Sequence, residues 1–242
     1  FSDPPTVPGV GPARIVDSWA KLMTDLGYDR FGAQGGDWGA MITSGLALRH
    51  PDRIIGTHFN MIGIGPSGAA RRPINDEEKA FFARAAEWGR QEGHHGAIQG
   101  TRPQTLSYAL ADSPVGLAAW ITERWRSWSD CDGDIERSFT KDELLTNIAI
   151  YWFSNSINSA NRLYFESSHG GGGGQLPEGE RMKPPAGFAV FPKEPLSPPR
   201  SWVERAYDLR HWTVMPRGGH FAAIEEPELF VEDVRAFFRP LR

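Results

Sequence analysis

The stretch that most constrains this chain is Gln-Gly-Gly-Asp-Trp-Gly-Ala at positions 34–40. A short strand candidate precedes it, and a helix-like run from Trp38 to His50 follows it. A sharp turn from a strand into a helix leaves little room for side chains, so glycines are favoured beside the residue at its apex. The stretch therefore predicts an acidic nucleophile presented at Asp37 or, as the simpler alternative, an aspartate that only caps the following helix.

The composition restricts the kind of partner. The 242 residues carry a formal net charge of −4 and no long basic run, which argues against nucleic acid or an anionic membrane surface as a partner. No apolar stretch approaches the roughly 18 residues that a membrane span requires. Cys131 is the only cysteine, so neither a disulfide framework nor a thiolate metal site is expected. We therefore expect a cytoplasmic protein without a metal or another cofactor.

Helix-like and strand-like runs alternate in both end regions of the chain, which is typical of a parallel sheet covered by helices. The first of these regions reaches residue 63, and the second begins near residue 186. The predicted elements in the two regions are helices at 13–26, 38–50 and 226–239 and strands at 30–34, 54–62, 187–191 and 212–215.

The middle of the chain carries helix signals only. Helix starts are predicted at Asn75, at Ser113 and at Thr140, the last as a capping box ahead of one long helix that reaches Tyr164. A glycine run at 170–174 is interpreted as a flexible hinge or a disordered loop. The predicted layout is an α/β core made of residues 1–63 and 186–242, with an all-helical segment at 64–185.

An aspartate nucleophile suits one kind of chemistry. Its carboxyl group, with an ordinary pKa of about 3.9, is ionised at neutral pH and needs no base to activate it. It can attack an sp³ carbon of an epoxide or an alkyl halide, and a histidine must then activate the water that hydrolyses the resulting ester. Such a histidine, His220, follows two glycines between the last predicted strand and the last helix, 183 residues after Asp37. The pattern favours His220 as this base over an ordinary loop histidine.

A base of this kind needs an acid that orients the imidazole and balances its charge. The acid is expected just after the penultimate strand, where Glu194 stands in Phe-Pro-Lys-Glu-Pro. Glu204, on a helix-like segment, and Asp208, in the next loop, are the alternatives. We favour Glu194 because it leaves a strand end, whereas Glu204 is typical of a solvated helix face.

The chain resembles the epoxide hydrolases of the α/β-hydrolase fold, in their microsomal-type branch. The matching stretches are QGGDWGA, TRPQTL, ADSPVGLAAWI, DELLTN, RLYFE, GFAVFPKEP and MPRGGHFAAIEEPELF. The resemblance implies an α/β-hydrolase fold with residues 64–185 as a helical cap. It also implies that Asp37 is the nucleophile, His220 the base and Glu194 the partner of that base. The implied reaction converts a small apolar epoxide to a vicinal diol, and a homodimer is compatible with it.

In this family two tyrosines of the cap bind the epoxide oxygen, and the resemblance assigns Tyr164 to one of them. A tyrosine with an ordinary pKa of about 10 is a far better proton donor to an alkoxide than water is. The other tyrosine is expected three residues before Ile98, where this chain has His95, with His94 as the neighbouring alternative. We expect Tyr164 to supply most of the proton donation, His95 to orient the oxygen, and Trp38 to contribute its backbone N–H.

The chain departs from the family pattern at its start. Only 36 residues precede Asp37, and the His-Gly-x-Pro motif that the family has upstream is not among them. The resemblance therefore predicts the C-terminal part of a longer enzyme, with part of the sheet only and the nucleophile strand at an uncovered edge. Two alternative functions remain, a hydrolase like the haloalkane dehalogenases and a catalytically silent hydrolase-like fragment.

Overall fold

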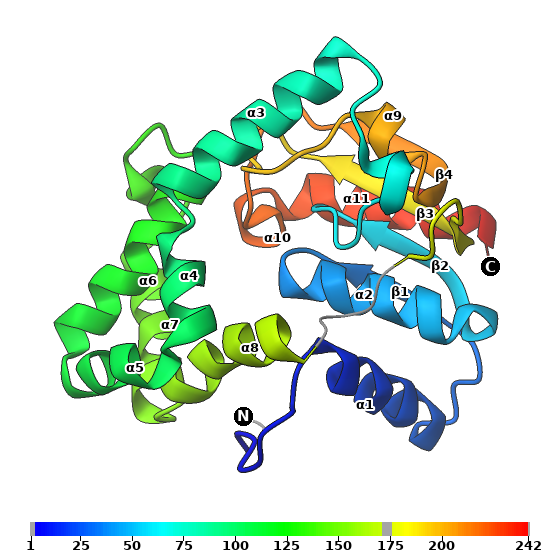
Figure 1. The fold of residues 1–242 in the computed structure, drawn as a ribbon. Helices are drawn as coiled ribbons and strands as arrows, with labels where there is room; N and C mark the ends of the chain where they lie inside the picture. Colours follow the sequence, from blue (N-terminus) through cyan, green and yellow to red (C-terminus); the bar gives the residue numbers. More distant parts are fainter. Residues whose placement is uncertain (1–2, 171–175, 242) are drawn as a thin grey trace.

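A parallel sheet with helices on both faces carries a separate group of helices beside it (Figure 1). The computed structural model describes residues 3–170 and 176–241, so most of the glycine run at 170–174 lies outside the described residues. The strand order is β1-β2-β3-β4, and every neighbouring pair is parallel. Strand β1, which leads to Asp37, lies at one edge of the sheet. The strands are β1 (Phe31–Gly35), β2 (Ile54–Phe59), β3 (Met182–Val190) and β4 (Tyr207–Val214).

Side chains alternate between the two faces of β1 and so connect the sheet to a helix layer on each side. Phe31 and Ala33 are buried in one cluster with the first helix, whereas the Gly32 between them faces Phe238 of the last long helix. A Cβ atom at Gly32 would lie 2.5 Å from Cε1 of that ring, so only glycine allows the contact. The covering helices are α1 (Pro12–Asp25), α2 (Trp38–Arg49), α9 (Arg200–Val203), α10 (Ala222–Glu225) and α11 (Pro227–Phe238).

The helices between β2 and β3 form the separate group, called the helical insertion below (Figure 1). Their predicted start signals are confirmed: the Asn75 and Ser113 side chains accept backbone N–H bonds, and Thr140 forms the full capping box with Glu143. Within the described residues no helix is long and apolar enough to cross a lipid bilayer. The insertion comprises α3 (Asp76–Gln91), α4 (His94–Thr101), α5 (Pro103–Asp112), α6 (Pro114–Trp128), α7 (Lys141–Phe153) and α8 (Ile157–His169).

The single long helix predicted to reach Tyr164 is wrong, because the chain forms two helices there. Helix α7 ends at Phe153, and Asn155 takes a φ of 49° before α8 begins at Ile157. Asparagine tolerates a positive φ better than most residues, since its short polar side chain can bond locally. The break redirects the chain so that α8 packs against α4 and α5.

Strand β3 begins at Met182, earlier than the predicted 187, although Pro184 and Pro185 interrupt the strand pattern. A proline cannot donate a hydrogen bond to a neighbouring strand. The structure accommodates both prolines because β2 pairs with β3 only from Ala186 onward, and the pairing with β4 shifts its register between Met182 and Pro185. Strand β4 likewise begins at Tyr207, before the predicted 212.

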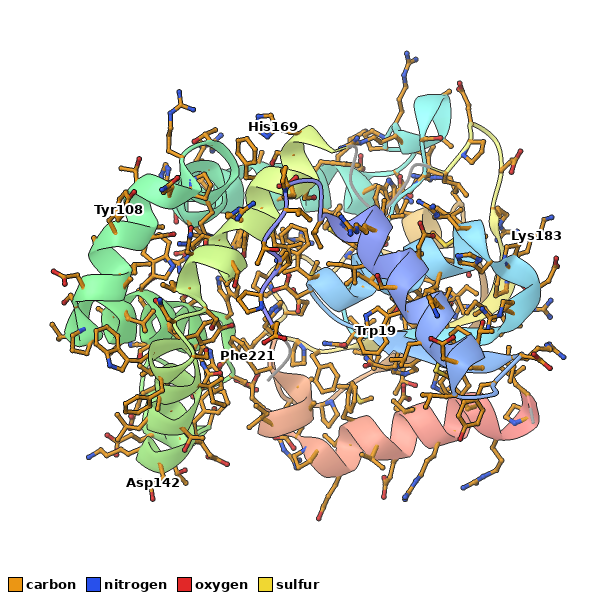
Figure 2. All side chains as sticks on the ribbon, turned by 90° about the horizontal axis from the view of Figure 1, so that it is seen from below. Trp19, Tyr108, Asp142, His169, Lys183 and Phe221 are labelled. Carbon is orange, nitrogen blue, oxygen red and sulfur yellow. The ribbon has the colours of Figure 1, made fainter. Side chains whose placement is uncertain are left out.

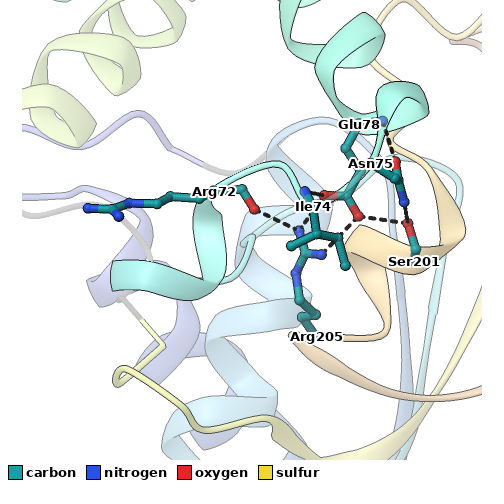
Figure 3. Close-up of polar contacts among 6 residues, drawn as sticks. All are labelled: Arg72, Ile74, Asn75, Glu78, Ser201 and Arg205. Carbon is teal, nitrogen blue, oxygen red and sulfur yellow. Dashed lines mark hydrogen bonds and ion pairs between the residues drawn. The ribbon is translucent and has the colours of Figure 1, made fainter.

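A fully buried carboxylate, Glu78 on α3, ties the helical insertion to α9 and to the turn before β4 (Figure 3). It accepts two bonds of 2.8 Å from the guanidinium of Arg205 and one of 2.7 Å from Ser201 Oγ. The N–H of Ile74 donates a further bond of 2.9 Å. Burial alone would raise the pKa of Glu78, but the bonds from Arg205, Ser201 and Ile74 outweigh burial and hold it below its ordinary value. The carboxylate is therefore charged and paired.

Glu78→Gln is expected to lower the free energy of unfolding by about 3 kcal/mol, because it leaves the Arg205 guanidinium without its charge partner. The folded pKa of Glu78 lies below the unfolded value of 4.5, so this contribution is present above pH 4.5 and is lost as the pH falls through the folded pKa. Urea denaturation at neutral and acid pH measures both effects. The exposed neighbour gives the control, Glu77→Gln, and equal stabilities of the two variants at neutral pH would contradict the expectation.

Candidate active site

Asp37 lies at the apex of the turn from β1 to α2, with φ 48° and ψ −127°. This conformation is strained for a residue with a side chain, at a typical cost of about 1–3 kcal/mol. A Cβ atom at Gly35 would lie 2.1 Å from the carbonyl oxygen of Gly39, so the turn excludes a side chain there. Asp37 occupies the N-cap position of α2, as the simpler alternative predicts, but its carboxylate accepts no capping hydrogen bond from the helix.

His220 lies on the loop between β4 and α10, and the backbone of the helical insertion holds this loop. The His220 N–H donates to the Trp128 carbonyl over 2.9 Å. Gly218 has a φ of 100°, and a Cβ atom at Gly219 would lie 2.6 Å from the same carbonyl oxygen. The two glycines before His220 thus allow the turn and the close approach that bring the imidazole toward Asp37.

The predicted acid, base and nucleophile form one hydrogen-bonded chain. His220 Nδ1 lies 2.8 Å from Oε2 of Glu194, and His220 Nε2 lies 3.1 Å from Oδ2 of Asp37. The Glu194 side chain is 2% exposed, whereas that of Asp37 is 43% exposed, so the chain of bonds runs from the core to an accessible carboxylate. The alternatives to Glu194 lie elsewhere: Glu204 pairs with Arg200, and Asp208 pairs with Arg210.

The two carboxylates determine the charge of the imidazole. Burial by itself lowers the pKa of His220, but the hydrogen bonds and the negative charges of Asp37 and Glu194 together raise it to about 10. At neutral pH the ring is therefore an imidazolium. If Asp37 became a neutral ester, one hydrogen bond and one charge that raise this pKa would be lost, and the ring would release its proton more readily. His220 can thus hold the Asp37 carboxylate before an ester forms and act as a neutral base after it has formed.

Two cavities meet at Asp37. The larger, of about 280 Å³, extends between α6, α7 and α8, and the smaller, of about 140 Å³, extends toward Met61 and Leu196. Aromatic and aliphatic side chains dominate both walls, as in most small-molecule sites. Phe221, labelled in Figure 2 near the helical insertion, stacks on Trp125 with ring centroids 4.7 Å apart. The residues shared by the two cavities are Asp37, Trp38, His95, Trp128 and Tyr164.

The other predicted site residues also reach this junction. The ring of Tyr164 lies edge-on to that of Trp38, with centroids 4.9 Å apart, and 6.0 Å from that of His95. Burial and the Asp37 charge raise the pKa of Tyr164, so its hydroxyl remains protonated. His95 lines both cavities, whereas His94 is exposed and lines neither. Among the described residues, the N–H groups of Trp38 and Gly39 at the start of α2 have no backbone acceptor, whereas that of Ala40 donates to the carbonyls of Gly36 and Asp37.

Three further residues at or near the site have roles that the sequence did not predict. Asp130 accepts the Gly218 N–H over 2.9 Å, and Glu225 accepts the N–H groups of Asp130 and Phe221. Both carboxylates thereby tie the His220 loop to the helical insertion. Tyr151 lines the larger cavity from α7. Each depends on a contact between distant segments, which periodicity and turn chemistry do not reveal.

The chain is similar to curated proteins along its whole length. A protein of Stigmatella aurantiaca, whose name assigns it provisionally to the epoxide hydrolases, is 42% identical over 243 residues, covering 100% of this chain and 54% of that protein. Epoxide hydrolase 1 of Oryctolagus cuniculus is 39% identical over 257 residues, covering 94% of this chain and 54% of that protein. The chain therefore spans about half the length of these relatives.

The chain is also similar to solved structures of epoxide hydrolases. The crystal structure of juvenile hormone epoxide hydrolase from the silkworm Bombyx mori matches with a TM-score of 0.86 and 30% identity, covering 100% of this chain and 62% of that one. No protein-family model matches the chain. Neither of the two relatives nor the silkworm enzyme is named as a haloalkane dehalogenase, so these comparisons do not favour that alternative.

Proposed function

The chain belongs to the epoxide hydrolases, and from this premise we propose that it hydrolyses an epoxide to a vicinal diol through an ester on Asp37. The parallel sheet and the helical insertion form an α/β-hydrolase fold with a helical cap, as predicted. The observation that supports the proposal most strongly is the hydrogen-bonded chain from Glu194 through His220 to Asp37, which ends in an apolar cavity. The activity is proposed for the protein that contains this chain.

In the first half of the reaction an Asp37 oxygen attacks one epoxide carbon. A carbon–oxygen bond forms to the carboxylate, the epoxide carbon–oxygen bond breaks, and its electron pair passes to the epoxide oxygen. That oxygen becomes an alkoxide and takes the proton of the Tyr164 hydroxyl, which lies beside Trp38 in the same cavity. The imidazolium of His220 holds Asp37 in place, and the strained turn presents the carboxylate to the substrate.

In the second half, the ester removes the negative charge of Asp37, so the pKa of His220 falls and the ring releases its proton to solvent. The neutral imidazole then takes a proton from water as the water oxygen attacks the ester carbonyl carbon. Backbone N–H groups at the start of α2 stabilise the oxyanion that forms. When the carbonyl carbon–oxygen bond to the alkyl group breaks, the departing alkoxide takes the proton from the imidazolium of His220. The diol then leaves with one oxygen atom that belonged to Asp37.

The two cavities indicate which epoxides fit. Because Asp37 lies at their junction, a substituent on one epoxide carbon can enter the larger cavity while one on the other carbon enters the smaller. The larger cavity presents Trp120, Trp125 and Phe221, which suit a flat apolar group. The substrate we propose is therefore an apolar epoxide whose bulkier substituent is placed among the helices of the insertion.

Oxygen labelling tests the proposed reaction. The protein is incubated with excess styrene oxide in water enriched in ¹⁸O, and the peptide that contains Asp37 is analysed by mass spectrometry. Turnover through an ester places ¹⁸O in the Asp37 carboxylate, because water attacks the carbonyl carbon. Diol formation with label in the diol after one turnover and none in Asp37 would instead mean direct attack by water on the epoxide. Neither diol nor label would identify a silent protein.

A further inference from the structure

His95 is poorly suited to donate a hydrogen bond to the substrate. Its Nδ1 lies 2.8 Å from the Glu92 carbonyl oxygen, which can only accept, so Nδ1 carries the proton. Burial lowers the pKa of His95 and favours the neutral ring, and the nearby charge of Arg124 acts in the same direction. In that tautomer Nε2 has no proton and is an acceptor. The position where the resemblance predicted a second donor therefore offers none.

Tyr151 is a donor on another helix of the same cavity. Its ring packs against the apolar cluster that includes Leu117, Ile148 and Ile157, so the ring position is fixed by the core of the insertion. Among residues 3–170 and 176–241 its hydroxyl takes part in no hydrogen bond, and it is not one of the buried polar atoms sealed away from solvent. Tyr151 lines the larger cavity together with Asp37 and Tyr164.

The negative charge of Asp37 also acts on the Tyr151 hydroxyl. Burial raises the pKa of Tyr151, and the negative charge of Asp37 raises it further, as for Tyr164. Tyr151 and Tyr164 line the same cavity, and Tyr151 is a further cause of the raised pKa of Tyr164. Both groups are protonated when substrate arrives, and both become stronger acids when ester formation removes the charge of Asp37.

We propose that Tyr151, which lines the same cavity as Asp37, is a second catalytic hydrogen-bond donor to the epoxide oxygen together with Tyr164. The inference rests on the proposed function. As the epoxide carbon–oxygen bond breaks, the charge on the oxygen is shared between two O–H groups, one of which transfers its proton while the other keeps its proton and donates a hydrogen bond. The tyrosinate that results recovers a proton from solvent before the next turnover.

The test separates the two half-reactions in single-turnover experiments with styrene oxide. Ester formation is followed by quenched-flow mass spectrometry of the protein, and ester hydrolysis by release of the diol. Tyr151→Phe keeps the ring and removes the hydroxyl, so ester formation is expected to slow about 10²-fold, with hydrolysis of the ester unchanged. Tyr151→Phe combined with Tyr164→Phe is expected to form no measurable ester.

Two further variants complete the experiment. Tyr108→Phe is the matched control, since Tyr108 is 69% exposed on α5, away from both cavities, and its rates should equal those of the unmodified protein. His95→Tyr, added to Tyr151→Phe, restores a donor at the junction and is expected to recover ester formation at least in part. A folded Tyr151→Phe protein that forms the ester at the unmodified rate overturns the inference. An unmodified protein that forms no ester overturns the proposed function instead.

Discussion

Asp37→Asn is expected to slow ester formation by about 10⁴-fold or more. The amide has no negative charge and is a poor nucleophile toward carbon, whereas its size and its tolerance of a positive φ match those of aspartate. The fold should therefore survive while the chemistry stops. Single-turnover mass spectrometry with styrene oxide measures the ester directly. Intact mass spectrometry excludes preparations in which deamidation has restored the carboxylate.

The same variant tests the electrostatic role of Asp37. The folded pKa of His220, about 10, lies above the unfolded value of 6.5. The imidazolium therefore contributes stability that is complete below pH 6.5 and is lost as the pH rises through about 10. Without the Asp37 charge the folded pKa falls, so Asp37→Asn should lose less stability than the unmodified protein between pH 6 and pH 10. Urea denaturation across this range and NMR titration of the ring measure the two quantities.

Asp132→Asn is the matched control for this substitution. Asp132 also has a positive φ, 47°, but its side chain is exposed and pairs with Arg137 away from both cavities. It should leave ester formation and the titration of His220 unchanged. Turnover by the Asp37→Asn protein at a rate comparable to that of the control would rule out Asp37 as the nucleophile.

The features that the sequence could predict are those that depend on residues close to one another in the chain. The Asn75 cap, the Thr140 capping box and the end of α1 before Gly27 depend on neighbouring residues, and the structure confirms all three. The turn at Asp37 and the loop at His220 were also recognisable, because so close a backbone approach restricts the neighbouring positions to glycine. The sequence interpretation missed the break at Asn155, where an asparagine between two helices takes a positive φ.

Contacts between distant segments explain what the sequence could not predict. Asp130 and Glu225 are 95 residues apart, and nothing in the sequence pairs them, yet together they tie the His220 loop to the helical insertion. Tyr151 occupies an ordinary helix position, and its orientation toward the cavity depends on how α7 packs. For His95 the resemblance identified the position but not the protonation of the ring. The tautomer depends on a hydrogen bond to one backbone carbonyl, that of Glu92.

His220→Gln is expected to stop the second half of the reaction while allowing the first. Asp37 is ionised without help from His220, so it can still attack the epoxide, but no imidazole remains to take a proton from water. Overall turnover should fall about 10⁴-fold, and the protein should accumulate one ester per chain. Intact mass spectrometry would show a mass increase equal to that of one substrate molecule, and peptide mapping would place it on Asp37.

Exposed His169, on the last turn of α8, supplies the control. His169→Gln should turn over normally and accumulate no ester, because within residues 3–170 and 176–241 its ring bonds to the Phe165 carbonyl and lines neither cavity. Measuring both the ester and the diol separates a role of His220 in ester formation from its role in ester hydrolysis. If His220→Gln formed no ester, His220 would be needed to hold or orient the Asp37 carboxylate. If it released diol steadily, another group would be activating the water, and the hydrogen-bonded chain to Glu194 would serve structure only.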